Sequence, residues 1–227
     1  MVCVGGNVMK KLDVVIISHN QKESIKKMFS SLSLYKFDKV VFVLDRCYDG
    51  TKRFLKSKGA YYVTAPWFCF GRRTSSLRNL GLEHCSDDAD VIFLDGDRFP
   101  VAGNLLSLRK KRNDVLLFPV VDDTRNLNEP YSKKEGKVEN NFYSCGLFMR
   151  RSAIDKIVEF QGELFPKFLE KGWGCEDLYM GDLCYHLGLS IDYYKGIVLN
   201  GSFENKFVDY DMFIKRMKAR EKLNVKW

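Results

Sequence analysis

The chain has 227 residues, of which 45% are hydrophobic and 29% charged, and its formal net charge is +8. These values are close to the average for globular proteins, so they argue against collagen-like, disordered and membrane-spanning classes. The length suits one α/β domain with a full hydrophobic core, and we interpret residues 1–227 as a single domain. The positive charge favours anionic partners, such as a nucleotide diphosphate, nucleic acid or a membrane surface.

The cysteines and the amino-terminal segment bear on the cellular compartment. Seven cysteines are scattered singly, without a C-x-x-C pair, which is typical of reduced thiols in a cytoplasmic protein. Residues 1–11, which we expect to be flexible, hold no apolar stretch long enough for a signal peptide. Since about 18 consecutive apolar residues occur nowhere, no transmembrane segment is expected. No zinc-finger, RNP or helix-turn-helix pattern stands out, so nucleic acid is not an expected partner.

The first half of the chain alternates apolar runs of strand length with helical patterns. The expected strands are Leu12–Ser18, Lys39–Asp45, a short one near Ala60–Thr64, and Asp90–Leu94. The expected helices begin near Asn20, after Asp49-Gly50-Thr51 and at Thr74, the last of them ending near His84. Because the strands are nearly all apolar, without period-two alternation, they predict a parallel sheet covered by helices on both faces.

The second half is less regular. Expected strands are Val115–Val121, Phe142–Arg150 and Ile191–Leu199, and expected helices are Ser152–Phe160 and Asp177–Leu187. The polar stretch Asp122–Asn141 has few apolar anchors and predicts a mobile loop. Residues 209–227 are expected to form a basic, amphipathic carboxyl-terminal helix.

Polar residues follow three of the expected strands at the point where each strand ends. They are Ser18-His19-Asn20, Asp45-Arg46 and Asp95-Gly96-Asp97. In open α/β sheets, ligands bind outside the carboxyl ends of the strands. We therefore expect these three segments to meet in one cleft.

The Asp95-Gly96-Asp97 segment places two carboxylates on a tight turn, where Gly96 lets the backbone come close to a ligand. Carboxylate and phosphate oxygens are the ligands that Mg²⁺ and Mn²⁺ prefer, and such an ion can bridge Asp97 to a diphosphate. A D-x-D sequence is also a common surface turn, so the pair alone does not decide between the two interpretations.

A second acidic pair, Glu176-Asp177, follows Gly172-Trp173-Gly174 at the start of an expected helix. A carboxylate in a shielded cleft can take the proton of an attacking hydroxyl, as an inverting sugar transfer requires. Acids at a helix start are also favoured by the helix dipole. That alternative accounts for the two acids but not for the Gly-Trp-Gly before them.

The ordered set of segments resembles the GT-A glycosyltransferases, chiefly the family-2 type. The segments are VVIISHN, VFVLDRCYDGT, GRRTSSLRNLG, VIFLDGD and GWGCEDLYMGDLCYHLG, and together they cover Leu12–Leu199. The resemblance implies an α/β GT-A fold with a mostly parallel, Rossmann-like central sheet flanked by helices. It also implies an inverting hexosyltransferase that uses Mn²⁺ or Mg²⁺ and moves a sugar from a nucleotide diphosphate, expected to be UDP, to a hydroxyl of a glycan or other acceptor.

The resemblance also implies roles for individual residues. Ser18 and Asn20 would border the nucleotide, and Asp45 would read the edge of the base. Arg78 would lie near the base or the phosphates. Asp95 would contact the ribose and the metal, and Asp97 would bind the metal directly.

The Trp173-to-Asp177 segment is similar to the W-G-x-E-D element of family-2 and β-1,4-galactosyltransferase-like enzymes. By that similarity Asp177 would be the general base, Trp173 would help to form the acceptor site, and Glu176 would hold acceptor hydroxyls. One residue departs from the pattern, because many GT-A enzymes have a histidine metal ligand after the last strand where this chain has Asn200. We therefore expect weaker metal binding.

Three other functions are alternatives to a soluble glycosyltransferase. A sugar-nucleotide nucleotidyltransferase would carry a G-x-G-T-R segment after the first strand, and VVIISHNQKES has none. A catalytically inactive glycan- or nucleotide-binding module would not need the carboxylates at Asp95, Asp97 and Asp177. A polyprenyl-phosphate glycosyltransferase would use the basic tail for peripheral membrane contact, whereas a solvated helix packed on the domain is the simpler interpretation of that tail.

Overall fold

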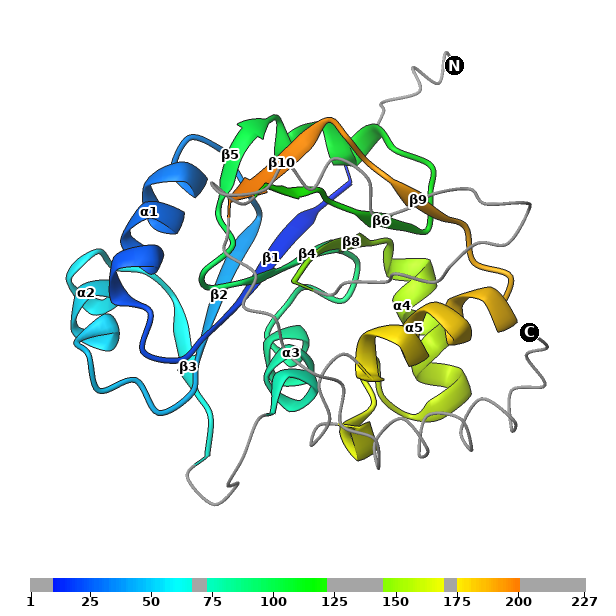
Figure 1. Ribbon diagram of the computed structural model, residues 1–227, viewed down its shortest axis with the longest axis horizontal. Helices are drawn as coiled ribbons and strands as arrows, with labels where there is room; N and C mark the ends of the chain where they lie inside the picture. Colours follow the sequence, from blue (N-terminus) through cyan, green and yellow to red (C-terminus); the bar gives the residue numbers. More distant parts are fainter. Residues whose placement is uncertain (1–9, 67–72, 122–144, 170–174, 201–227) are drawn as a thin grey trace, which may run out of the picture.

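The computed structural model describes residues 10–66, 73–121, 145–169 and 175–200 (Figure 1). Its α-helices are α1 Lys22–Leu32, α2 Thr51–Ser57, α3 Thr74–Glu83, α4 Arg151–Gln161 and α5 Cys175–His186, with 3₁₀ turns at Leu105–Lys110 and Lys167–Leu169. None of these described helices has the length and the apolar character needed to cross a membrane. The flexible start, the polar loop and the carboxyl-terminal helix expected from the sequence fall in residues 1–9, 122–144 and 201–227, outside the described residues.

A seven-stranded sheet forms the centre of the molecule, in the order β3-β2-β1-β4-β8-β6-β9. Its strands are β1 Leu12–Ser18, β2 Lys39–Leu44, β3 Tyr62–Thr64, β4 Asp90–Asp95, β6 Val115–Leu117, β8 Gly146–Met149 and β9 Ile191–Tyr193. The expected, mostly parallel sheet is confirmed, although β8 runs antiparallel to both β4 and β6. Because β2 and β3 lie on one side of β1 and β4 lies on the other, the strand order reverses between β1 and β4.

Two strands expected to be continuous are broken, and the prediction was wrong there. Val115–Val121 divides into β6 and β7 (Val120–Val121), because Pro119 lacks the N–H that a central strand donates. Ile191–Leu199 divides likewise into β9 and β10 (Ile197–Asn200). The two later pieces join β5 (Pro100–Gly103), which the sequence analysis missed, in a three-stranded sheet of order β5-β10-β7.

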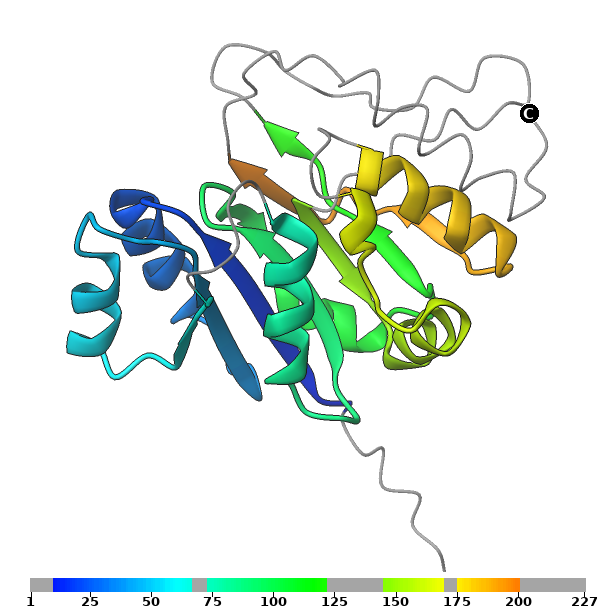
Figure 2. The ribbon, with the colours of Figure 1, turned by 90° about the horizontal axis from the view of Figure 1, so that it is seen from below.

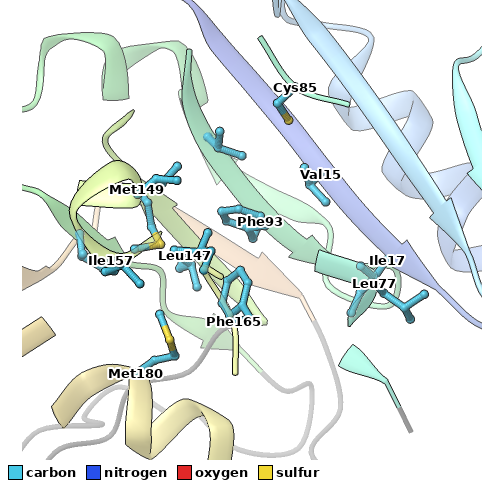
Figure 3. Close-up of a cluster of buried hydrophobic side chains, with 14 of the residues drawn as sticks. Val15, Ile17, Leu77, Cys85, Phe93, Leu147, Met149, Ile157, Phe165 and Met180 are labelled. Carbon is cyan, nitrogen blue, oxygen red and sulfur yellow. The ribbon is translucent and has the colours of Figure 1, made fainter. Parts of the chain in front are cut away.

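The hydrophobic core has two layers, one on each face of the central sheet. Val14 and Ile16 of β1 belong to the layer that α1 and α2 cover. Val15 and Ile17 belong to the layer under α3, α4 and α5, part of which Figure 3 shows. In Figure 1, α1 and α2 accordingly lie at the opposite side of the molecule from α4 and α5. Burying each large aliphatic side chain contributes about 1.5–3 kcal/mol, so the central strands are firmly held.

Gly81 of α3 lets this helix approach the sheet closely, and Figure 2 shows the helix lying over the strands. A Cβ atom at Gly81 would lie 2.3 Å from Cγ1 of Val15 and 3.0 Å from Cγ2 of Val43. We expect Gly81→Ala to lower the free energy of unfolding by about 1–3 kcal/mol, because the added methyl group overpacks the core. Denaturant titration measures this. Glu83→Ala, at an exposed position of the same helix, should change stability by less than about 0.5 kcal/mol.

Candidate active site

The carboxyl ends of β1, β2 and β4 are joined by backbone hydrogen bonds. The N–H of Asp45 donates to the carbonyl oxygen of Ser18 at 2.9 Å, and the N–H of Gly96 donates to that of Ile17 at 2.7 Å. The three polar segments expected to converge therefore lie side by side. They do so where the strand order reverses, which is the usual ligand position in such a sheet.

Gly96 is required by the closeness of this approach. A Cβ atom there would lie 2.6 Å from Oε1 of Gln21 and 2.9 Å from the carbonyl oxygen of Ile17. The turn closes with a hydrogen bond of 2.8 Å from the N–H of Arg98 to the carbonyl oxygen of Asp95. It leaves the Asp97 side chain 45% exposed and that of Asp95 partly exposed.

The two carboxylates of this turn fit a divalent ion that is shared with a phosphate-bearing ligand. Mg²⁺ is commonly held by one or two protein carboxylates together with substrate phosphates. Within the described residues, no group of three or more His, Cys, Asp and Glu side chains could hold a metal ion. Asn200 lies beside the turn, since its N–H donates to the carbonyl oxygen of Phe99 at 2.9 Å.

A buried arginine lies against each of these carboxylates. Nη2 of Arg78 donates to Oδ1 of Asp95 at 2.8 Å, and Arg78 is only 2% exposed. Nε of Arg98 lies 3.8 Å from Oδ1 of Asp97. Arg78 was expected at the site from the sequence. Arg98 was not, although its place directly after Asp-Gly-Asp was an available signal.

In the Arg78-Asn79-x-Gly81 segment of α3, Arg78 contacts a site carboxylate, whereas Asn79 and Gly81 hold the helix in place. Asn79 donates through Nδ2 to the carbonyl oxygen of Phe165 at 2.8 Å and accepts the N–H of Phe165 at 2.9 Å. Asn79 thus holds the Phe165 backbone, and Gly81 allows close packing on β1. Arg78 contacts a site carboxylate, so the segment both positions α3 and supplies a guanidinium to Asp95.

Asp45 is held by two arginines that lie close to it. Arg46 binds both carboxylate oxygens, with distances of 3.1 and 2.9 Å, and Nη2 of Arg73 lies 2.5 Å from Oδ1. Burial raises the pKa of Asp45, but the hydrogen bonds and charges of Arg46 and Arg73 outweigh it, so that the pKa is lowered overall. The carboxylate is therefore ionised at neutral pH, and Arg46 and Arg73 are partners that the sequence analysis did not assign.

This pairing predicts that Asp45→Ala destabilises the fold. Arg73 is 4% exposed and would lose its carboxylate, and leaving one partner of a buried ion pair uncompensated costs about 3–5 kcal/mol. Because the folded pKa of Asp45 is lowered, its contribution is present above the ordinary value of 3.8 and is lost as the pH falls toward the folded pKa. Denaturant titration should show a stability difference at pH 7 that shrinks in acid. Asp88→Ala, which removes an exposed pair with Lys11, should leave stability nearly unchanged at both pH values.

The residues that follow β1 organise the neighbouring loop. Asn20 adopts a left-handed backbone conformation with φ 51° and accepts the N–H of Tyr48 on Oδ1 at 2.7 Å. Nδ1 of His19 lies 2.8 Å from the carbonyl oxygen of Asp45. Ser18 is buried, and its hydroxyl has no hydrogen-bond partner in the described part of the chain. Ser18 thus lies next to Asp45, and Asn20 lies beside Tyr48 in the loop that follows β2.

Asp177, in the first turn of α5, is half-buried. Burial is the largest cause that raises the pKa of the Cys145 thiol. The charges of Asp95 and Asp177 raise this pKa further, and those of Arg98 and Arg78 lower it. The carbonyl oxygen of Cys145 also accepts the N–H of Asp95 at 3.1 Å. Trp173 lies outside the described residues, and the Glu176 side chain is not described either.

Solved structures share this fold. A scan against protein-family models and a search of curated proteins find no match. The chain is similar to residues 1–349 of Staphylococcus aureus TarS in complex with UDP-GlcNAc, with a TM-score of 0.70 and 16% identity. The match covers 94% of this chain and 66% of that one. A longer TarS structure matches at a TM-score of 0.69 and 18% identity, over 96% of this chain and 40% of that one.

Two further structures extend the comparison. Glucosyl-3-phosphoglycerate synthase from Mycobacterium tuberculosis, in complex with Mg²⁺ and UDP, has a TM-score of 0.60 at 12% identity, over 93% of this chain and 79% of that one. The mannosyltransferase PcManGT from Pyrobaculum calidifontis, in complex with GDP-Man and Mn²⁺, has a TM-score of 0.60 at 12% identity, over 97% and 66%. At these identities the similarity establishes the fold, which is GT-A. The chain spans about two thirds of the length of the first TarS structure.

Proposed function

We propose that this chain, whose GT-A fold is set out above, is a metal-dependent, inverting glycosyltransferase that moves a hexose from a nucleotide diphosphate to a hydroxyl of a glycan or other acceptor. The observation that carries the proposal is the pair of carboxylates Asp95 and Asp97. They lie on a tight turn where the strand order reverses, hydrogen-bonded to the end of β1. The neighbouring structures were solved with UDP-GlcNAc, with UDP and Mg²⁺, and with GDP-Man and Mn²⁺, which supports a nucleotide-sugar donor.

The nucleotide would lie over the ends of β1 and β2. Ser18 and Asn20 border this position, and Asp45 would accept an N–H from the edge of the base, with uracil as the expected base. Arg46 and Arg73 keep that carboxylate ionised, so it acts only as a hydrogen-bond acceptor. Arg46 is partly exposed beside Asp45, so it would border the base as well.

The diphosphate would lie over Asp95 and Asp97, which would hold Mn²⁺ or Mg²⁺. When bound, the ion neutralises charge on the departing diphosphate. Arg78 holds Asp95 in place through the hydrogen bond of 2.8 Å. Asp95 would also contact the ribose. The side-chain oxygen of Asn200 would be a weaker ligand than the histidine of many GT-A enzymes, in line with the weaker metal binding expected from the sequence.

The acceptor would bind on the α5 side of the site. Asp177, half-buried in the first turn of α5, would remove the proton of the attacking hydroxyl. Trp173 would form part of the acceptor site and Glu176 would hold acceptor hydroxyls. A base placed opposite the leaving group makes the reaction an inverting one.

The enzyme would act in a reducing compartment, and we propose the cytoplasm. Cys47, Cys85, Cys145 and Cys184, whose side chains are described, are free thiols. Burial raises the pKa of Cys85 and Cys184 to about 12, so these two thiols pack in the core rather than react.

Slow hydrolysis of a nucleotide sugar without an acceptor tests the proposed function. The protein is incubated with UDP-glucose, UDP-GlcNAc, UDP-galactose and GDP-mannose, with Mn²⁺ or with EDTA, and released nucleoside diphosphate is measured. Release from one of these donors with Mn²⁺, and not with EDTA, is the expected result. The absence of release from all of them, together with no binding of UDP or GDP in calorimetry, would refute the proposal.

A further inference from the structure

Arg98 follows Asp97 in the sequence, at the end of the turn that carries the two candidate metal-binding carboxylates. The turn directs the side chains of Asp97 and Arg98 differently, so that Asp97 is 45% exposed and Arg98 only 9%. A buried charge is costly unless opposite charges compensate for it. Oδ1 of Asp97, 3.8 Å from Nε of Arg98, supplies one such opposite charge.

Two pairs of opposite charge lie at this turn. Nη2 of Arg78 donates to Oδ1 of Asp95 at 2.8 Å, and Nε of Arg98 lies 3.8 Å from Oδ1 of Asp97. In each pair the guanidinium charge balances the carboxylate charge. A divalent cation held by the two carboxylates would add positive charge to these balanced pairs, which attracts a diphosphate.

Each of the two arginines, Arg78 and Arg98, weakens binding of the ion and strengthens binding of the diphosphate. Each lowers the negative charge that draws the ion to the carboxylates, and each adds to the positive charge that holds the diphosphate. Arg98 is the arginine at Asp97, the more exposed of the two turn carboxylates. Arg78 is held to Asp95 by a hydrogen bond of 2.8 Å, whereas the contact of Arg98 is longer and easier to exchange.

We propose that Arg98 exchanges partners when the donor binds: it neutralises Asp97 in the free protein and donates to the donor diphosphate once the divalent ion has taken Asp97. This inference rests on the proposed function. A guanidinium presents several N–H donors in a fixed plane, which suits phosphate oxygens better than an ammonium group does. Arg98 would thus supply positive charge where Asn200 replaces a stronger metal ligand.

The test compares two binding constants in Arg98→Gln and in the wild type by calorimetry. Mn²⁺ alone should bind the variant about fivefold more tightly, because a cation about 4 Å from the carboxylate is removed. The nucleoside diphosphate that the wild type prefers, UDP or GDP, should bind about 10- to 100-fold more weakly at saturating Mn²⁺, because a charge-assisted hydrogen bond is lost. General damage to the site would weaken both affinities, so the opposite signs are the diagnostic result.

Arg109→Gln is the matched control. Arg109 is also largely buried and pairs with Asp38 at 2.7 Å, but Asp38 lies before β2, at the opposite end of the sheet. Both affinities should remain unchanged in this variant. Arg98→Lys keeps the charge and should leave the Mn²⁺ affinity near that of the wild type, while nucleotide affinity falls less than in Arg98→Gln.

The outcomes distinguish a failure of the proposed glycosyltransferase function from a failure of the role proposed for Arg98. If the wild type binds neither UDP nor GDP with Mn²⁺, the proposed function fails, and the inference fails with it. If the wild type binds and Arg98→Gln matches it, or loses both affinities, the role of Arg98 alone is overturned. If Arg98→Gln does not fold, Arg98→Lys decides, because unchanged nucleotide affinity in that variant contradicts a contact with the diphosphate.

Discussion

Asp177→Asn is expected to lower sugar transfer by about 10²–10⁴-fold, the range that general-base assistance commonly contributes. The amide keeps the size of the carboxylate and removes its ability to accept a proton. Donor and metal affinity should not change, because the proposed base acts on the acceptor hydroxyl. Steady-state kinetics with the donor found in the hydrolysis screen measures the first effect, and calorimetry with UDP or GDP and Mn²⁺ measures the second.

One variant separates this effect from a loss of structure, and a second separates the role of Asp177 from that of Glu176. Asp155→Asn changes a carboxylate on α4 that pairs with Arg151 on the surface, and it should leave transfer unchanged. Glu176→Gln should raise the acceptor KM more than it lowers kcat, if Glu176 holds acceptor hydroxyls. An Asp177→Asn protein with wild-type turnover would falsify the assignment of the base.

The stereochemistry of the product gives an independent check on the same base. One base opposite the leaving group produces inversion, so an α-linked donor should yield a β-linked product, which is distinguished by proton NMR coupling constants. A retained configuration would contradict the mechanism, whatever the effect of Asp177→Asn.

Asp97→Ala is expected to abolish activity and to remove the metal dependence of nucleotide binding. The wild type should bind UDP or GDP weakly in EDTA and tightly with Mn²⁺, because the carboxylates of Asp95 and Asp97 repel a diphosphate until a cation binds to them. In the variant, Mn²⁺ should no longer improve nucleotide affinity. Calorimetric titration of both nucleotides, with and without Mn²⁺, measures this.

Asp88→Ala is the matched control, because Asp88 is an exposed carboxylate that pairs with Lys11 away from the site. It should keep the full metal dependence of the wild type. Equally tight nucleotide binding by the wild type in EDTA and in Mn²⁺ would count heavily against Asp95 and Asp97 as the metal ligands.

Much of the central sheet could be predicted from local sequence. The apolar run of Leu12–Ser18 matches β1 residue for residue, and the run of Lys39–Asp45 differs from β2 by one residue. Such strands are buried on both faces, so most positions are apolar and the ends are marked by polar residues. Strands that change sheets, such as Val115–Val121, have no such mark, because both halves are apolar and only Pro119 separates them.

The sequence by itself determined the sheet class and the residues at the strand ends, because strand propensity and strand length act between near neighbours. The need for glycine between Asp95 and Asp97 arises from contacts with Gln21 and Ile17, which are distant in the sequence. The tertiary structure alone decided which arginine meets which carboxylate. Arg73 reaches Asp45 from 28 positions away and Arg78 reaches Asp95 from 17. These contacts depend on how closely α3 packs on the sheet, and that closeness follows from the absent side chain of Gly81. No periodicity in the sequence encodes it, since the interacting atoms belong to separate elements that meet only in the folded core.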